Sequence, residues 1–121
     1  MTGTYTEITK IETDKDSYSP GETVWVSVFI KNLYSASVHI RCEGLANDSK
    51  FMDLDAWANP GIIYSFGGYF TMPNSGVTIH TRSYYEGSDG LWHLDDEMTE
   101  DVSLAELVPE FSQFEITDYA V

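Results

Sequence analysis

The chain has 121 residues, the length of one domain, and its single cysteine, Cys42, excludes a disulfide within it. Apolar residues make up 42% and aromatic residues 14% of the sequence, which excludes a disordered chain. The net charge of −14 repels phosphate backbones, so we expect no nucleic-acid partner. Because free cysteines are usually buried, we expect Cys42 in the core.

The first ten residues have neither a basic n-region nor an apolar h-region, so no signal peptide is predicted in the given chain. No stretch approaches the roughly 18 apolar residues that a membrane-spanning helix needs. We therefore expect no insertion into a membrane.

Apolar and polar residues alternate with a period of two, which is typical of half-buried strands. In 23–31, Val24, Val26 and Val28 share one face, while Trp25 takes the other. Apolar residues on both faces indicate a central strand. Strands are predicted at 4–11, 23–31, 37–43, 50–57, 62–70, 76–85, 91–98 and 111–119. The segment 102–108 is predicted to be a helical turn or an irregular strand, because Pro109 ends it.

Turn sequences separate these strands. Pro20 and Gly21 predict a type II turn, because proline presets φ and glycine accepts a positive φ. Similar signals recur at intervals of roughly 8–12 residues, as in sandwiches and barrels. The sequence therefore predicts an all-β, immunoglobulin-like antiparallel β-sandwich of seven or eight strands, with a jelly roll as the alternative.

Two stretches resemble known β-modules. TDKDSYSPGETVWVSVFIKN (13–32) is similar to the opening of macroglobulin-type and other bacterial immunoglobulin-like domains. YFTMPNSGVTIHTRSYY (69–85) resembles a strand pair of bacterial surface β-repeats. Modules of this kind also decorate phage tails and capsids. The resemblance implies strand positions and a surface or virion setting, and it carries no catalytic residue.

The acidic stretch SYYEGSDGLWHLDDEMTED (83–101) is predicted to be a hairpin. We expect Tyr84 or Tyr85, Leu91 or Trp92, and Leu94 to face the core, while most carboxylates stay in water. A carboxylate pair for glycoside hydrolysis needs a desolvated cleft, and the sequence offers no insertion to build one. Motifs for nucleophilic triads, metalloproteases and phosphate loops are absent, so no catalytic residue is assigned.

Two kinds of ligand remain open. Calcium prefers six to eight oxygen ligands, which Asp53 and Asp55, or Glu86, Asp89 and Asp95, can offer, although no metal ligand is assigned. A carbohydrate site needs exposed aromatic rings, and Tyr85 and Trp92 are the candidates. Trp25 and Trp57 lie in patterns that predict core or near-core positions.

We expect residues 1–108 to form the sandwich and 109–121 to form a C-terminal strand, docked on it or exchanged with a neighbour. The candidate contact residues of this last segment are Phe111, Phe114, Ile116 and Tyr119.

The predicted function is that of a non-catalytic structural or assembly module without a cofactor, in a virion or on an extracellular surface. Its partners are expected to be protein subunits, in a homo-oligomer or a larger assembly. The alternative is a calcium- or carbohydrate-binding adhesion module, and a small hydrolase is the third hypothesis.

Overall fold

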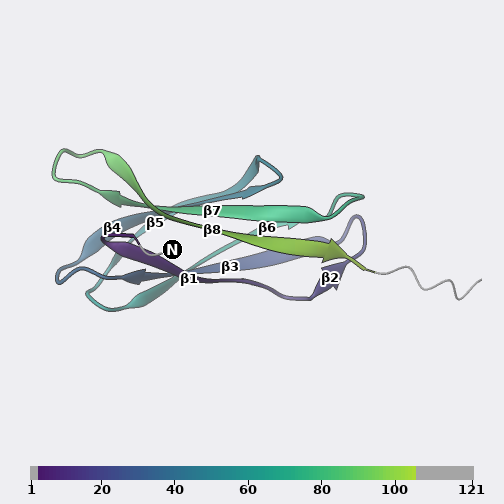
Figure 1. Cartoon of the computed structure of the whole chain (residues 1–121), viewed down its shortest axis with the longest axis horizontal. Helices are drawn as coiled ribbons and strands as arrows, with labels where there is room; N and C mark the ends of the chain where they lie inside the picture. Colours follow the sequence, from purple (N-terminus) through teal and green to yellow (C-terminus); the bar gives the residue numbers. More distant parts are fainter. Residues whose placement is uncertain (1–2, 106–121) are drawn as a thin grey trace, which may run out of the picture.

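The computed structural model describes residues 3–105, which form two stacked β-sheets (Figure 1). Among these residues there is no helix, and therefore none that could cross a membrane. The strands are β1 (Thr6–Thr13), β2 (Ser17–Tyr18), β3 (Thr23–Asn32), β4 (Val38–Ala46), β5 (Ser49–Ala58), β6 (Ile63–Thr71), β7 (Val77–Glu86) and β8 (Trp92–Leu104).

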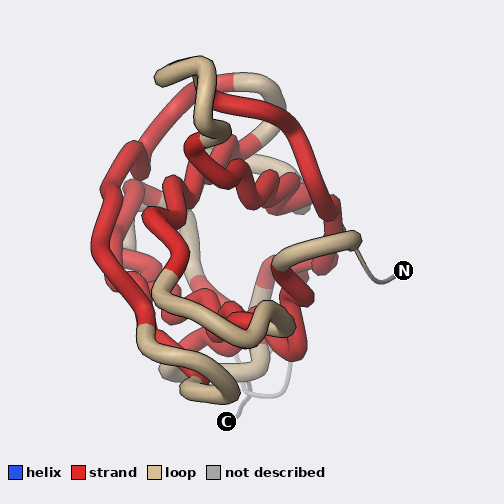
Figure 2. Tube along the Cα trace, turned by 90° about the vertical axis from the view of Figure 1, so that its left-hand side faces the viewer, coloured by secondary structure: helices blue, strands red, loops and turns tan. Residues whose placement is uncertain are grey.

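The strand order is β1-β3-β6 in the smaller sheet and β2-β8-β7-β4-β5 in the larger one. Figure 2 looks along the strands and shows them surrounding a common interior, which the core side chains fill. Every ladder is antiparallel except the short parallel pairing of β2 with β8. The prediction of an all-β sandwich with seven or eight strands is confirmed.

The alternation read from the sequence describes the core correctly. Val24, Val26, Val28 and Ile30 of β3 are all at most 2% exposed. Cys42 on β4 is fully buried as well, as predicted. β3 is the middle strand of its sheet, as predicted.

Several side chains lie elsewhere than predicted. Trp25 and Trp57 are 54% and 65% exposed because each lies on the outer face of its sheet. Leu94 is 50% exposed, and the reason is a register shift at Ser83/Tyr84 in the β7–β8 ladder. This irregularity breaks the alternation on which the prediction for Leu94 rested.

Most strands end within two residues of the predicted limits. β4 instead continues to Ala46, and β2 was not predicted as a strand. The largest difference is in β8. It continues through Val102 to Leu104, so these three residues belong to a strand and not to a helical turn. The predicted strand at 111–119 lies outside the described residues.

The turns follow the predicted chemistry. Gly21 has φ of 88°, and the N–H of Glu22 donates to the carbonyl of Ser19 at 3.1 Å. Asn47 and Asp48 also have positive φ values, 46° and 70°, and form the two-residue turn between β4 and β5. This second turn was not predicted.

Candidate functional site

The two sheets meet along two seams, and side chains close the first of them, between β1 and β8. Both oxygens of Asp95 accept hydrogen bonds from backbone N–H groups, from Thr4 at 2.9 Å and from Thr6 at 2.6 Å. Asp96 accepts the N–H of Ile8 at 2.8 Å. The free edge of β1 is therefore occupied by carboxylates that belong to the other sheet.

This seam corrects the expectation for part of the acidic stretch. Asp96 is only 3% exposed, so it is a structural residue and not a solvated one. A methyl group on Gly3 would lie 2.6 Å from the backbone oxygen of Asp95. The sequence before β1 therefore needs a glycine to approach Asp95 this closely.

The second seam, between β5 and β6, is not closed in this way. Within residues 3–105 no backbone hydrogen bond joins these strands, although each pairs on its other side. They meet through apolar side chains: the rings of Phe51 and Phe70 lie 5.1 Å apart, and Met52 packs against Gly68. Each strand consequently presents one edge at this seam.

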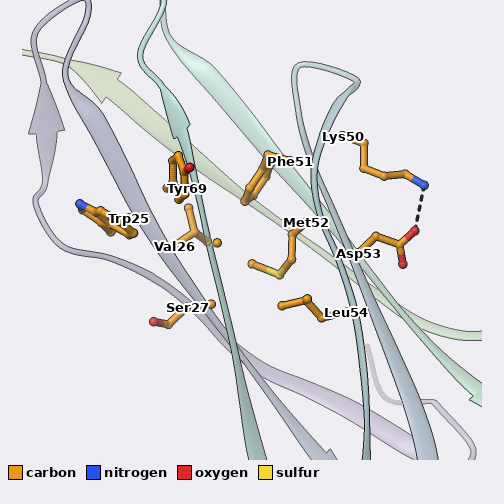
Figure 3. A pocket seen from close by; sticks show the side chains of 11 residues that line it. Trp25, Val26, Ser27, Lys50, Phe51, Met52, Asp53, Leu54 and Tyr69 are labelled. Atoms are coloured by element: carbon orange, nitrogen blue, oxygen red, sulfur yellow. Dashed lines mark hydrogen bonds and ion pairs between the residues drawn. The ribbon is translucent and has the colours of Figure 1, made fainter.

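A groove of about 780 Å³ crosses the seam, and Figure 3 shows the side chains along it. Trp25 and Tyr69 lie on one side with ring centroids 4.9 Å apart, and Lys50, Asp53 and Leu54 lie on the other. The floor includes Gly67, where an added methyl group would meet only one atom, at 4.0 Å. We call this feature the seam groove.

Strand β6 differs from the other long strands in its charge. Its sequence, IYSFGGYFT, has no charged residue, in a chain whose net charge is −14. Ile63 and Tyr69 are 52% and 59% exposed. β6 therefore combines an uncharged edge with exposed apolar side chains.

A second depression lies at the end of the sandwich where β5 and β7 end. We call it the end hollow; it has a volume of about 610 Å³ and is lined by Tyr5, Tyr34, Ser37, Val38, His39, Trp57, Tyr85, Glu86, Gly87, Ser88, Asp89 and His93. Its aromatic rings contact one another. The ring of Tyr5 lies 5.1 Å from that of Tyr34 and 4.4 Å from that of Tyr85.

His39 connects the end hollow to the outer face of the larger sheet. Its Nδ1 lies 2.9 Å from Glu86 and its Nε2 lies 2.7 Å from Asp55, while its ring stacks on Trp57 with a 4.8 Å centroid distance. Burial lowers the pKa of His39, but the hydrogen bonds to Glu86 and Asp55 outweigh burial, so the pKa is raised. A protonated imidazole donates to both carboxylates.

Further along this face, the basic side chains are paired with acids. Arg41 donates two hydrogen bonds to Asp53, at 2.7 and 2.8 Å, and these lower the pKa of Asp53 to about 2. Glu43 forms ion pairs with both Arg82 and Lys50. These cations are engaged within the chain and do not reach the end hollow.

The predicted binding residues are only partly brought together. Tyr85 lines the end hollow, and Trp92 lies beside it with its ring 4.8 Å from that of His39. Phe111, Phe114, Ile116 and Tyr119 lie outside the described residues. Four further residues of this site were not predicted from the sequence: Tyr5, Tyr34, His39 and Trp57.

The calcium candidates do not converge. Asp53 binds Arg41, Asp55 binds His39, Asp89 binds His93, and Asp95 binds the backbone before β1. Across residues 3–105, no three His, Cys, Asp or Glu side chains gather as a metal site would require. His39 separates Asp55 from Glu86, because these two carboxylates contact opposite nitrogens of its ring.

The fold defines a class: the chain is an immunoglobulin-like β-sandwich. No protein-family model matches the chain, and no curated protein sequence matches it. Solved structures do resemble it. One is the CARDB domain of the PF1109 protein from Pyrococcus furiosus, solved in complex with di-metal ions; the TM-score is 0.65 and the identity 15%, over 87% of this chain and 93% of that one.

Two further structures are similar. Spo0M, a sporulation control protein from Bacillus subtilis, has a TM-score of 0.53 and 16% identity, over 86% of this chain and 51% of that one. A chain of the human seminal plasma complex between zinc 2-glycoprotein and prolactin inducible protein has a TM-score of 0.56 and 10% identity, over 82% and 97%. At these identities the likeness establishes the fold alone.

Proposed function

We propose that this chain is a non-catalytic structural module that joins a second copy of itself through the β5–β6 seam, as a subunit of a virion or surface assembly. The observation that carries this proposal is strand β6, an uncharged edge strand with exposed Ile63 and Tyr69. Edge strands that lack charges, proline or a cover are ready to pair with another strand.

The charge of the rest of the chain supports a specific contact. A net charge of −14 keeps free copies apart through repulsion. At the seam this repulsion is reduced, because β6 contributes no charge and Lys50 offsets Asp53 beside it. This lower charge favours an edge-to-edge approach of two copies at the seam.

The state of the histidines supports a non-catalytic role. His39, His80 and His93 each contact a carboxylate. Within the described part of the chain, no serine or threonine hydroxyl hydrogen-bonds to any of them, and the only thiol, Cys42, is buried. Nucleophilic catalysis needs a nucleophile next to its base.

Light scattering coupled to size-exclusion chromatography tests the proposal. We expect a mass above that of the 13.6 kDa monomer, rising with protein concentration. The variant Gly67→Lys places a charge in the seam groove and should give a monomer with an unchanged melting temperature. The matched control, Thr99→Lys, adds the same charge to an exposed position of β8 and should still associate. A wild-type chain that is monomeric at every concentration would contradict the proposal.

Carbohydrate binding is the second candidate function. It is favoured by Trp25 and Tyr69, two exposed rings that lie together on the outer face of the smaller sheet. A glycan array tests this second function. Binding to a glycan that is lost in Trp25→Ala would support a carbohydrate-binding surface. A metal site like that of the CARDB domain is not proposed, since no ligand group for it gathers within residues 3–105.

A further inference from the structure

The end hollow has an excess of negative charge. Glu86 and Asp89 line it, and Asp55 lies next to it through His39. Even with both His39 and His93 protonated, the carboxylates of Asp55, Glu86 and Asp89 leave one uncompensated negative charge. Among residues 3–105, no lysine or arginine lines the hollow. A ligand that carries positive charge therefore fits this site better than a neutral one.

Aromatic faces surround these carboxylates. Tyr34 and Trp57 are 48% and 65% exposed, and Trp57 stacks one face on His39. The hydroxyls of Tyr18 and Tyr84 hydrogen-bond to carboxylates, whereas those of Tyr5, Tyr34 and Tyr85 have no partner within residues 3–105. Aromatic rings attract cations through their negative faces, and a planar cation also stacks on them.

The loops that carry these groups are held in place before any ligand arrives. Asn32 is fully buried; its amide donates to the carbonyls of Ala36 and Ala58 at 2.9 Å and accepts the N–H of Tyr34 at 2.7 Å. On the other side, Asp89 accepts the N–H of Leu91 at 3.0 Å. A site fixed in this way loses little conformational entropy when it binds.

We propose that the end hollow binds the guanidinium group of an arginine side chain presented by a protein partner. Guanidinium is planar, so it stacks on tyrosine or tryptophan, and its fork of N–H donors matches the carboxylates of Glu86 and Asp89. This site is separate from the seam groove. Binding at the end hollow does not depend on pairing with a second copy at the β5–β6 seam.

The test uses the full chain and three small probes: N-acetylarginine amide, choline and methyl glucoside. Binding is followed by NMR through the indole N–H of Trp57 and the ring protons of Tyr34, at low and high salt. We expect N-acetylarginine amide to bind tightest, to bind more weakly as salt rises, and to shift these signals. Tighter binding of choline or methyl glucoside, or no shift with millimolar N-acetylarginine amide, would overturn the proposal.

Variants then locate the site. Glu86→Gln and Tyr34→Ala should each weaken binding of N-acetylarginine amide by about threefold or more. The matched control, Trp25→Ala, removes an exposed aromatic ring from the seam groove and should leave the affinity unchanged. A short peptide with one arginine should also bind, and the same peptide with glutamine in its place should not. Equal binding of the two peptides would contradict the role of the guanidinium.

Discussion

The carboxylate of Asp96 on β8 accepts the backbone N–H of Ile8 on β1 at 2.8 Å, across the boundary between the two sheets. A second oxygen of Asp96 accepts the N–H of Glu97, so both oxygens are used. One buried acid thus takes the place of a missing strand along the edge of β1, and its removal is open to measurement.

Asp96→Ala should lower the free energy of unfolding by about 1–3 kcal/mol, because it leaves the N–H of Ile8 without an acceptor. Urea denaturation followed by tryptophan fluorescence measures this change. Glu100→Ala, an exposed acid on the same strand, is the control and should stay within about 0.5 kcal/mol of wild type. An equal loss in both variants would contradict the structural role of Asp96.

Cys42 should be inert in the folded protein. It lies fully buried on β4, the strand between β5 and β7, and burial raises the pKa of its thiol to about 12. Because the thiolate is the reactive form, a disulfide reagent at pH 8 should not modify the native chain. The same reagent should modify one thiol per chain in urea, and rapid reaction without urea would show that the core opens.

The ion pairs of His39 should make stability depend on pH. The pKa of His39 is raised in the folded state. The stability that its ion pairs contribute is therefore complete below the unfolded pKa of 6.5 and is lost as the pH rises through the folded pKa. Compared with wild type, His39→Gln should therefore be destabilised more at pH 6 than at pH 9. Urea titrations at both pH values give the comparison. A difference that does not change with pH would mean that the imidazole acts only by packing on Trp57.

A chain that ends at Val108 should fold, because residues 3–105 already form two sheets and a core between them. Circular dichroism and the melting temperature report folding, and light scattering reports association. Unfolding of this shortened chain would instead show that 109–121 docks as part of its own sandwich. Loss of association in a folded chain would show that the segment is exchanged between copies.

The sequence predicted the inward faces well because only inward positions of a sandwich strand must be apolar. Val24, Val26 and Ile30 satisfy this rule at every second residue. The rule does not say whether an outer face is covered, so exposed Trp25 was predicted to be core or near-core. Asn47 and Asp48 were a usable turn signal, since both residue types tolerate positive φ, but no turn was predicted at these two residues.

The candidate sites were harder to predict because they join distant segments. Asp95 meets the backbone of Thr4, ninety-one positions earlier in the chain. In the end hollow, Tyr5 contacts Tyr85, and no local pattern relates the two. The acidic stretch therefore suggested a solvated hairpin, whereas Asp95 and Asp96 bind backbone N–H groups in and just before the first strand.

The difference between the two seams limits what edge-to-edge pairing can build. Within residues 3–105, carboxylates occupy the β1–β8 side, and the β5–β6 side alone is open between the sheets. Two copies that pair β6 with β6 are related by a two-fold axis, and neither copy then has a second open seam. Such pairing yields a closed dimer and not a growing fibre, so any larger lattice would use these dimers as its building blocks.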